Sequence, residues 1–233
     1  MSQKTVIRAE GVSRRFGKDA AEVVAVDQVS FSLMQGEFAA LVGPSGSGKS
    51  TLLNLVGGLD DADHGTIELA GRDLASLSAS EKSDFRRDHI GFIFQSYNLI
   101  PVLSAAENIE YIMLLQGVKG AERRRRVNEM LEIVGLSGLG HRRPAEMSGG
   151  QQQRVAVARA MASNPEIILA DEPTANLDSK TGIALLETMR QLNESQGVTF
   201  LFSTHDQKII DRAKRLIWLE DGRIVDDQRA QTL

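Results

Sequence analysis

The residues "GPSGSGKST", from Gly43 to Thr51, have the types and the spacing of a phosphate-binding loop. They fit G-x-x-x-x-G-K-[ST] between the apolar run FAALV and the helical pattern LLNLVGG, which is the context that gives this motif its meaning. Glycines let the backbone wrap around phosphate oxygens, and the first amides of the next helix point at the negative charge. The ammonium group of Lys49 can reach the β- and γ-phosphates, and the Ser50 hydroxyl can ligate Mg²⁺.

Two acidic residues, Asp171 and Glu172, directly follow the apolar run IILA and stand at the end of a predicted strand. A carboxylate there can hold Mg²⁺ beside the phosphate loop, which is the role expected of Asp171. Successive strand residues point to opposite sides, so Glu172 should face elsewhere and polarise the attacking water. His205 follows the next apolar run and could contact the γ-phosphate or orient Glu172, although a lone histidine at a strand end is more often structural.

A second anion-binding element is predicted at "MSGGQQQR", residues 147–154. Ser148 can cap the helix that follows, and Gly149 and Gly150 leave its first amides bare at the positive end of the helix dipole. Such a helix end favours an anion. The alternative is an ordinary capped helix.

The elements that position these residues alternate along the chain. Near-continuous apolar runs predict strands at 38–42, 167–170 and 198–202, buried on both faces of a largely parallel sheet. The segments 23–33 and 66–74 favour a smaller antiparallel part. Helices are expected from Leu177 to Gln196, with Asp178 as N-cap, and after His205.

Between about Ser96 and Ser163 strand signals vanish. Ser104-Ala-Ala-Glu107 forms a capping box, and Val127, Met130, Leu131 and Val134 mark one face of a helix that ends at Gly135. We therefore predict a single α/β domain over 1–233, with a catalytic core formed by 1–95 and 164–233 and an inserted helical subdomain at about 96–163.

Composition limits the function classes. The 233 residues are 42% hydrophobic and 25% charged, which is ordinary for a globular chain. A formal net charge of −4 argues against bulk nucleic-acid binding. The absence of cysteine excludes disulfides and thiol chemistry. No apolar run approaches the length of about 18 residues that a membrane span needs, and "MSQKTVIRAE" lacks the apolar region of a signal peptide, so a cytosolic location is expected.

Taken in order, these motifs resemble the nucleotide-binding subunit of ABC (ATP-binding cassette) transporters over essentially the whole chain. "MSGGQ" is similar to the family's signature sequence, Gln95 in IGFIFQ to its Q-loop, and "ANLD", closed by Asp178, to its D-loop. His205 matches the switch histidine. Phe16 in RRFG stands where the family has an aromatic residue that stacks on adenine.

The resemblance implies a P-loop NTPase of the ABC-ATPase fold, with a mixed sheet core, an antiparallel β part and an inserted α-helical lobe. It implies Mg²⁺-dependent ATP hydrolysis with Glu172, His205 and Lys49 in catalysis, and Mg²⁺ held by Ser50, Gln95 and Asp171. The implied nucleotide-binding residues are Phe16, Gly43, Pro44, Ser45, Gly46, Ser47, Gly48, Lys49, Ser50, Thr51 and Gln95.

The same resemblance answers why there is a second anion loop. In this family two subunits pack head to tail, and each signature loop faces the phosphates on the other subunit. The residues implied to act in trans are Ser148, Gly149, Gly150, Gln151 and Asp178. The implied partners are a second copy of the chain, in an ATP-sandwich homodimer, and separate transmembrane permease subunits, with the chain peripheral on the cytoplasmic face of the cell (inner) membrane.

Details of the motifs indicate a branch of the family. "GGLD" at 57–60 and "DEPTANLD" are closer to the branch of lipoprotein release, macrolide efflux and antimicrobial-peptide export. Ala175 stands where that branch usually has Gly, and Met147 where the signature usually has Leu. The apolar stretch around Phe94, Tyr97, Leu99 and Ile100 is either the permease-docking groove or part of the lobe's own core.

Other function classes fit less well. A soluble ABC ATPase of translation or DNA repair should carry two cassettes or a long coiled coil, and a P-loop GTPase should carry an Asn-Lys-x-Asp reader. A regulatory ABC protein with little turnover remains an alternative, against which the intact Lys49, Asp171, Glu172 and His205 speak. The arginine run from Arg123 to Arg126 wraps around a helix, so we expect solvated or acid-paired side chains there.

Overall fold

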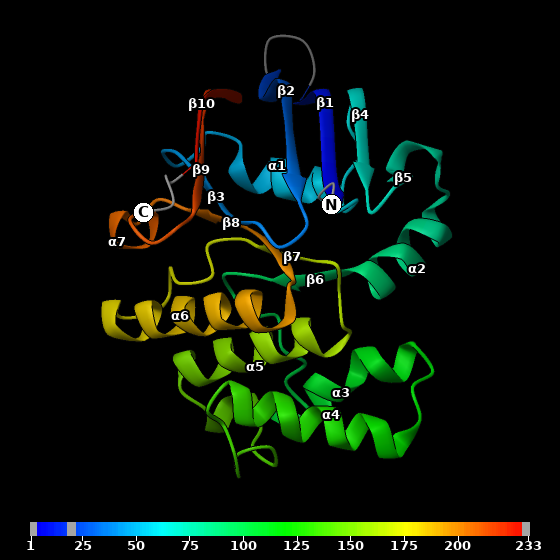
Figure 1. Ribbon diagram of the computed structural model, residues 1–233, viewed down its shortest axis with the longest axis vertical. Coiled ribbons are helices and arrows are strands. Elements are labelled where there is room, and N and C mark those ends of the chain that lie inside the picture. Colours follow the sequence, from blue (N-terminus) through cyan, green and yellow to red (C-terminus); the bar gives the residue numbers. More distant parts are fainter. Residues whose placement is uncertain (1–3, 18–21, 230–233) are drawn as a thin grey trace.

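The structure is a computed structural model that describes residues 4–17 and 22–229. Within these ranges, one sheet has six strands in the order β10-β9-β3-β8-β7-β6 (Figure 1). Its neighbours pair parallel except in the β9–β10 hairpin. The strands are β3 (Phe38–Val42), β6 (Ile90–Ile93), β7 (Ile167–Ala170), β8 (Thr199–Thr204), β9 (Arg215–Glu220) and β10 (Arg223–Arg229). The strands predicted at 38–42, 167–170 and 198–202 are confirmed.

A second sheet is antiparallel, as predicted from 23–33 and 66–74. Among the described residues its order is β2-β1-β4-β5, formed by β1 (Thr5–Phe16), β2 (Val23–Met34), β4 (His64–Leu69) and β5 (Arg72–Asp73). Strand β1 was not predicted from its sequence, TVIRAEGVSRRF, because charges and Gly11 interrupt the alternation. The register of β1 shifts on both sides of this glycine.

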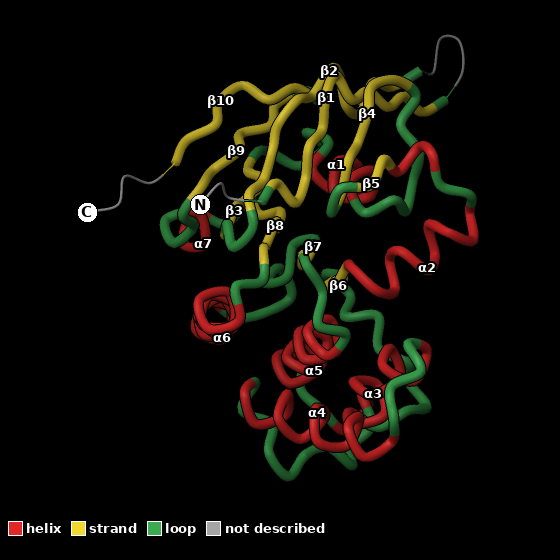
Figure 2. The backbone as a smooth tube through the Cα atoms, turned by 45° about the vertical axis from the view of Figure 1, so that its right-hand side comes forward, coloured by secondary structure: helices red, strands yellow, loops and turns green. Residues whose placement is uncertain are grey.

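Helix α1 (Lys49–Val56) lies between the two sheets (Figure 2). Strand β3 is buried on both faces, and its residues alternate between two cores. Ala39 and Leu41 pack with α1 and the antiparallel sheet, whereas Phe38 and its alternate neighbours face the helices on the other side. The Phe38 ring lies 5.0 Å from that of Phe202, centroid to centroid. This continuous packing fixes the C-terminal end of β3.

The helices of the inserted lobe are α3 (Ala105–Leu115), α4 (Gly120–Ile133) and α5 (Gly149–Ala162) (Figure 1). The predicted capping box is confirmed: Ser104 Oγ accepts the Glu107 amide, and the Glu107 carboxylate accepts the Ser104 amide at 2.7 Å. The predicted apolar face of α4 is also confirmed, since Val127, Met130, Leu131 and Val134 are all buried. The remaining helices are α2 (Ala79–His89), α6 (Ser179–Gln196), the short α7 (Gln207–Ile210) and the 3₁₀ turns η2 (Leu74–Ser76) and η3 (Pro144–Glu146).

Several local details differ from the sequence prediction. The helix expected from Leu177 begins at Ser179, and its predicted N-cap is confirmed, since Asp178 accepts the amides of Lys180 and Thr181. The helix expected after His205 is the single turn α7. Strand β6, which was not predicted, extends the sheet just before Gln95.

The arginine run on α4 is partly acid-paired, as expected. Arg123 donates to Glu110 at 2.8 Å, and Arg126 donates to Glu129 at 3.1 Å. Across residues 4–17 and 22–229, none of the helices combines the length and the apolar character that crossing a bilayer demands.

Candidate active site

The loop between β3 and α1 is shaped by two glycines that no other residue could replace. Gly43 has φ +155°, and a Cβ there would lie 2.0 Å from the Leu219 carbonyl oxygen. Gly48 has φ +99°, and its Cβ would lie 2.1 Å from the Ala25 carbonyl oxygen. Side chains at either point would push the loop away from β9 and β2. The loop is therefore packed closely against these two strands.

Lys49 begins α1, and its ammonium group is folded into this loop. Lys49 Nζ donates to the carbonyl oxygens of Gly43 and Pro44, at 2.8 Å each, and the residue is buried. A buried cation beside the positive end of a helix is poised for an anion of high charge, as the phosphate-loop motif predicts. Ser47, also buried, has an Oγ with no hydrogen-bond partner among the described residues.

Strand β7 brings Asp171 to the start of the same helix. Asp171 Oδ1 accepts a hydrogen bond from Ser50 Oγ at 2.9 Å and another from Ser203 Oγ at 2.7 Å. Ser203 belongs to β8, so three separate elements meet at one carboxylate oxygen. The predicted proximity of Asp171 and Ser50 is thus found in the structure.

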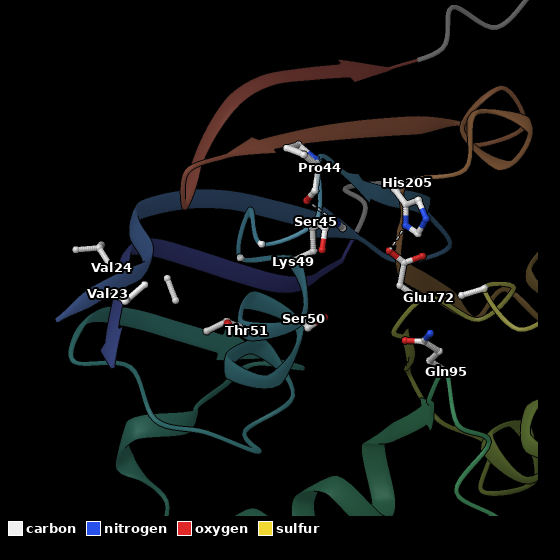
Figure 3. Close-up of a pocket in the computed structure, with 14 residues that line it drawn as sticks. Val23, Val24, Pro44, Ser45, Lys49, Ser50, Thr51, Gln95, Glu172 and His205 are labelled. Atoms are coloured by element: carbon white, nitrogen blue, oxygen red, sulfur yellow. Dashed lines mark hydrogen bonds and ion pairs between the residues drawn. The ribbon is translucent and has the colours of Figure 1, made fainter. Parts of the chain in front are cut away.

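The side chain of Glu172 has different partners from that of Asp171, as predicted, but its direction is set by a tight turn and not by strand alternation. The strand has already ended at Ala170, and Glu172 has φ +44°, which is left-handed backbone. Its amide donates to Ser203 Oγ at 2.8 Å, and its Oε1 lies 2.8 Å from Nδ1 of His205 (Figure 3). The structure therefore places His205 against Glu172, which was one of the two positions considered from the sequence.

A pocket of about 580 Å³ opens over these side chains. Of the predicted nucleotide and catalytic residues it is lined by Pro44, Ser45, Gly46, Gly48, Lys49, Ser50, Thr51, Gln95, Glu172 and His205 (Figure 3). Gly43, Ser47 and Asp171 are not among the lining residues. The pocket is also lined by Val23, Val24, Ala25 and Ala175, which were not singled out from the sequence.

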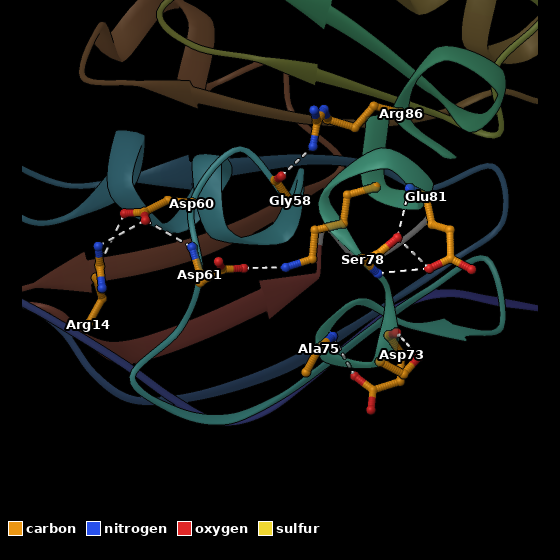
Figure 4. Close-up of polar contacts among 11 residues, drawn as sticks. Arg14, Gly58, Asp60, Asp61, Asp73, Ala75, Ser78, Glu81 and Arg86 are labelled. Atoms are coloured by element: carbon orange, nitrogen blue, oxygen red, sulfur yellow. Dashed lines mark hydrogen bonds and ion pairs between the residues drawn. The ribbon is translucent and has the colours of Figure 1, made fainter. Parts of the chain in front are cut away.

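Phe16 lies at the end of the β1–β2 pairing, opposite Val23 of the pocket wall. Its ring does not line the pocket itself, and the Arg14 guanidinium lies over it, with Cζ 4.9 Å from the ring centroid. Arg14 donates in turn to Asp60 (Figure 4) and to Asp63, both of which follow α1. Its bonds to these carboxylates raise the pKa of Arg14, so the cation stays charged. This pairing places Val23 in the pocket wall, and no local pattern in the charged sequence of β1 indicates it.

The signature residues lie outside this pocket. Ser148 is the N-cap of α5: its Oγ accepts the Gln151 amide at 3.3 Å, and Gln151 Oε1 accepts the Ser148 amide at 3.0 Å. Ser148 is exposed, and Gly149 and Gly150 form the first turn of a 14-residue helix. The predicted cap is confirmed. The N-terminus of α5 therefore does not line the pocket of the chain's own phosphate loop.

The loop after β6 connects the pocket to the lobe. The backbone oxygen of Gln95 accepts a hydrogen bond from Asn176 Nδ2 at 2.9 Å. Two residues later, the carbonyls of Tyr97 and Asn98 both accept from Arg159 of α5, at 2.9 and 2.5 Å. Burial lowers the pKa of Arg159. Gln95 at the pocket and Ser148 at the start of α5 are thus joined through one guanidinium and one helix.

Asp178, the last predicted site residue, lies on the loop after Glu172. Its Oδ2 accepts the Thr181 hydroxyl at 2.6 Å. This bond and the amides of the first turn of α6 lower the pKa of the Asp178 carboxyl, so the cap is ionised at neutral pH. Asp178 does not line the chain's own pocket.

A phosphate loop with Lys49 and Ser50 beside Asp171, on a mixed sheet with an inserted helical lobe, is the arrangement of an ATP-binding cassette ATPase. The chain belongs to the ABC transporter family, whose model matches residues 26–175. It is 45% identical over 221 residues to an uncharacterized ABC transporter ATP-binding protein of Methanocaldococcus jannaschii, covering 95% of this chain and 98% of that protein.

Similarity extends to a longer protein and to solved structures. The macrolide export ATP-binding/permease protein MacB of Burkholderia pseudomallei is 46% identical over 217 residues, and this chain spans 33% of its length. The match covers 93% of this chain. The ATP-binding cassette MJ0796, solved as a dimer bound to ADP and Pi, matches with a TM-score of 0.90 at 39% identity. That match covers 97% of this chain and 100% of the cassette. The predicted family, the fold and the ATPase activity are therefore confirmed.

Proposed function

We propose that this chain binds Mg·ATP in the pocket of Figure 3 and that hydrolysis there powers transport through separate membrane subunits. The observation that carries the proposal is the convergence of Lys49, Glu172 and His205 on one pocket, from loops that follow β3, β7 and β8. In a parallel sheet such loops lie along one edge, which is where α/β proteins bind nucleotides.

The oxygen donors beside the pocket fit a magnesium ion. The Ser50 hydroxyl and the Asp171 carboxylate share a hydrogen bond of 2.9 Å, and Gln95 supplies an amide oxygen from the pocket wall. Hydroxyl, carboxylate and amide oxygens are hard ligands of the kind Mg²⁺ takes together with phosphates. When bound, the metal would neutralise charge on the phosphates. Ser50, Asp171 and Gln95 are the residues that we propose hold it.

Within this pocket Lys49 binds phosphate oxygens, and Glu172 polarises the attacking water. Glu172 is half-buried and carries His205 on one carboxylate oxygen, which fixes its orientation toward the pocket. A carboxylate held in one direction within reach of the substrate meets the geometric need of a general base.

We further propose that two copies of the chain close on ATP. Ser148, Gly149, Gly150 and Gln151 present a helix N-terminus on a face that the chain's own phosphate loop does not use. The dimeric state of the similar cassette MJ0796 supports a twofold arrangement. Each signature helix, with the nearby Asp178 loop, would then complete the other copy's site.

The partner in the membrane would dock on a groove of about 340 Å³ between β6, α2 and α3. The apolar stretch that was predicted to form either the docking groove or the core of the lobe contributes to both. Phe94 lines the groove, whereas Leu99 packs against the core of the lobe. Apolar walls from Leu59, Tyr111 and Leu115 are exposed to solvent. Exposed apolar surface of this kind marks a protein contact.

Branch motifs and the similarity to MacB support a permease of the macrolide-efflux or lipoprotein-release type, with the chain peripheral on the cytoplasmic membrane face. The second candidate function is that of a soluble or regulatory ABC ATPase. Co-purification of a tagged chain from detergent-extracted membranes of its own host distinguishes the two candidate functions. Leu115→Glu should release an integral membrane partner without loss of basal ATPase activity.

Leu114→Glu is the matched control. Leu114 and Leu115 are adjacent on α3 and equally exposed, at 52% each, but only Leu115 lines the groove. Retention of the partner by Leu114→Glu and its loss by Leu115→Glu support docking at the groove. An active ATPase that binds no integral membrane protein in any variant would instead establish the soluble role.

A further inference from the structure

Ser203 is a polar residue in the interior of the six-stranded sheet. It lies on β8, between β3 and β7, where it pairs with Leu41, and its exposed fraction is 0%. The preceding residues Phe200, Leu201 and Phe202 are all buried and apolar. A buried hydroxyl at such a point costs free energy unless both its proton and its lone pairs find partners.

Both partners of this hydroxyl belong to the acidic pair of the active site. Ser203 Oγ donates its proton to Asp171 Oδ1 at 2.7 Å and accepts the Glu172 amide at 2.8 Å. A hydroxyl has one proton, so these two roles are complementary and do not compete. The same Oδ1 accepts from Ser50 at the start of α1. One chain of hydrogen bonds thus runs from the phosphate-loop helix through Asp171 and Ser203 to the Glu172 backbone.

The hydrogen bond from the Glu172 amide to Ser203 Oγ supports an unfavourable backbone conformation. Left-handed backbone at φ +44° is unfavourable for a residue with a Cβ, and it persists only where surrounding contacts hold it. Ser203 holds the amide of Glu172, and His205, two residues further on, holds its carboxylate. Residues at the end of β8 and just after it therefore hold both the backbone amide and the carboxylate of Glu172.

We propose that Ser203 is a positioning residue for ATP hydrolysis. Its hydroxyl holds Asp171 Oδ1 beside Ser50 and fixes the turn that aims Glu172 into the pocket. The inference rests on the roles proposed above for Asp171 and Glu172. Without the hydroxyl, Oδ1 of Asp171 loses a donor, and the partly buried amide of Glu172 loses its acceptor.

The test compares Ser203→Ala with Thr199→Ala. Thr199 is a matched control, because it is also fully buried on β8 and its Oγ1 accepts one backbone amide, from Gly36 at 3.1 Å, at the opposite end of the strand. We expect Ser203→Ala to lower kcat roughly ten- to a hundredfold and to raise the Mg²⁺ concentration for half-maximal activity by about tenfold. Affinity for a fluorescent ATP analogue without metal should change less than about twofold. Ser203→Thr, which keeps the hydroxyl, should recover most of the lost kcat.

The possible results distinguish failure of the Ser203 inference from failure of the proposed active site. If Ser203→Ala matches Thr199→Ala in kcat and in Mg²⁺ dependence, at equal folded fraction by circular dichroism, Ser203 is only a structural residue and the inference is overturned. If Asp171→Asn and Glu172→Gln also hydrolyse ATP at the wild-type rate, the proposed active site fails as well. A selective loss of kcat and Mg²⁺ affinity that Ser203→Thr restores supports the assignment.

Discussion

His205 and Glu172 are joined side chain to side chain, with the imidazole Nδ1 2.8 Å from carboxylate Oε1. The histidine side chain is 63% exposed and the glutamate side chain 15% exposed. The imidazole thus bridges solvent and a largely buried carboxylate that lines the pocket. Substitution of either residue should therefore alter the orientation of the other side chain, and the role of Glu172 can be tested by substitution.

Replacement of Glu172 by Gln should stop turnover while ATP still binds. Glutamine keeps the size and a hydrogen-bond acceptor for His205 but cannot polarise water as a base, so we expect kcat to fall by about 10²–10⁴-fold. ATP should remain uncleaved and hold two copies together. Size-exclusion chromatography with Mg·ATP then shows a dimer for Glu172→Gln and a monomer for Lys49→Ala. A Glu172→Gln protein that stays monomeric, or hydrolyses at the wild-type rate, contradicts the assignment.

Ser148→Arg should abolish hydrolysis without weakening nucleotide binding by the monomer. A large cation on the exposed cap disrupts the helix N-terminus that would contact the other copy's nucleotide, but Ser148 does not line the chain's own pocket. Mixing this variant with Lys49→Ala, which is inactive for a different reason, should restore activity. In the mixed dimer one site carries both lesions and the other carries neither. If mixing restores nothing, the signature loop acts on its own chain.

Chelation of Mg²⁺ should separate binding from hydrolysis. The phosphate loop and Lys49 contribute charge without a metal, whereas Ser50 and Asp171 have only oxygen atoms to offer. With EDTA present we expect a fluorescent ATP analogue to bind and phosphate release to stop, and added Mg²⁺ should restore it. Phosphate release that continues in EDTA would exclude the proposed metal site.

The parts of the site that could be predicted are formed by residues that are close together in the sequence. The loop at 43–51 and the Ser148 cap depend on residues within one turn of each other, and Asp171 follows a strand whose burial is visible in IILA. Glu172 illustrates the limit: strand alternation predicted that it points away from Asp171, but the strand has ended and a left-handed turn sets its direction.

The parts that could not be predicted depend on distant segments meeting. Val24 lines the pocket because β2 pairs with β1, and β1 itself carries too many charges to show a strand pattern. Strand β6 reads IGFI, where Gly91 interrupts the apolar run, whereas the equally short β7 reads IILA without a break. Ser203 reads as one hydroxyl in an apolar strand, and only the fold brings it to Asp171 and Glu172.

Arg215→Met should destabilise the fold. The Arg215 side chain is 6% exposed and donates to Asp227 at 2.7 Å and to Glu37 at 2.7 Å, so it joins β9, β10 and the start of β3. Removing this buried guanidinium leaves Asp227 without its ion pair and Glu37 with Arg229 as its remaining cation, and we expect the free energy of unfolding to fall by about 3 kcal/mol. Arg223→Met is the control, because Arg223 is 71% exposed in its pair with Asp27 and should change stability by less than about 1 kcal/mol. Urea denaturation followed by circular dichroism measures both. Equal values for the two variants would contradict the buried network.

Arg14→Met should weaken ATP binding through Phe16. The Arg14 guanidinium lies over one face of the Phe16 ring and donates to Asp60 (Figure 4) and Asp63, so it ties the predicted adenine-stacking residue to the loop after α1. Loss of this contact frees the ring, and we expect the KM for ATP to rise about three- to tenfold with kcat nearly unchanged. Arg15→Met, which removes an exposed pair with Glu22 and no ring contact, is the control. In a Phe16→Ala background the Arg14 substitution should have no further effect on KM, because the two residues act through one surface. Additive effects of Arg14→Met and Phe16→Ala would show that Arg14 acts independently of the ring.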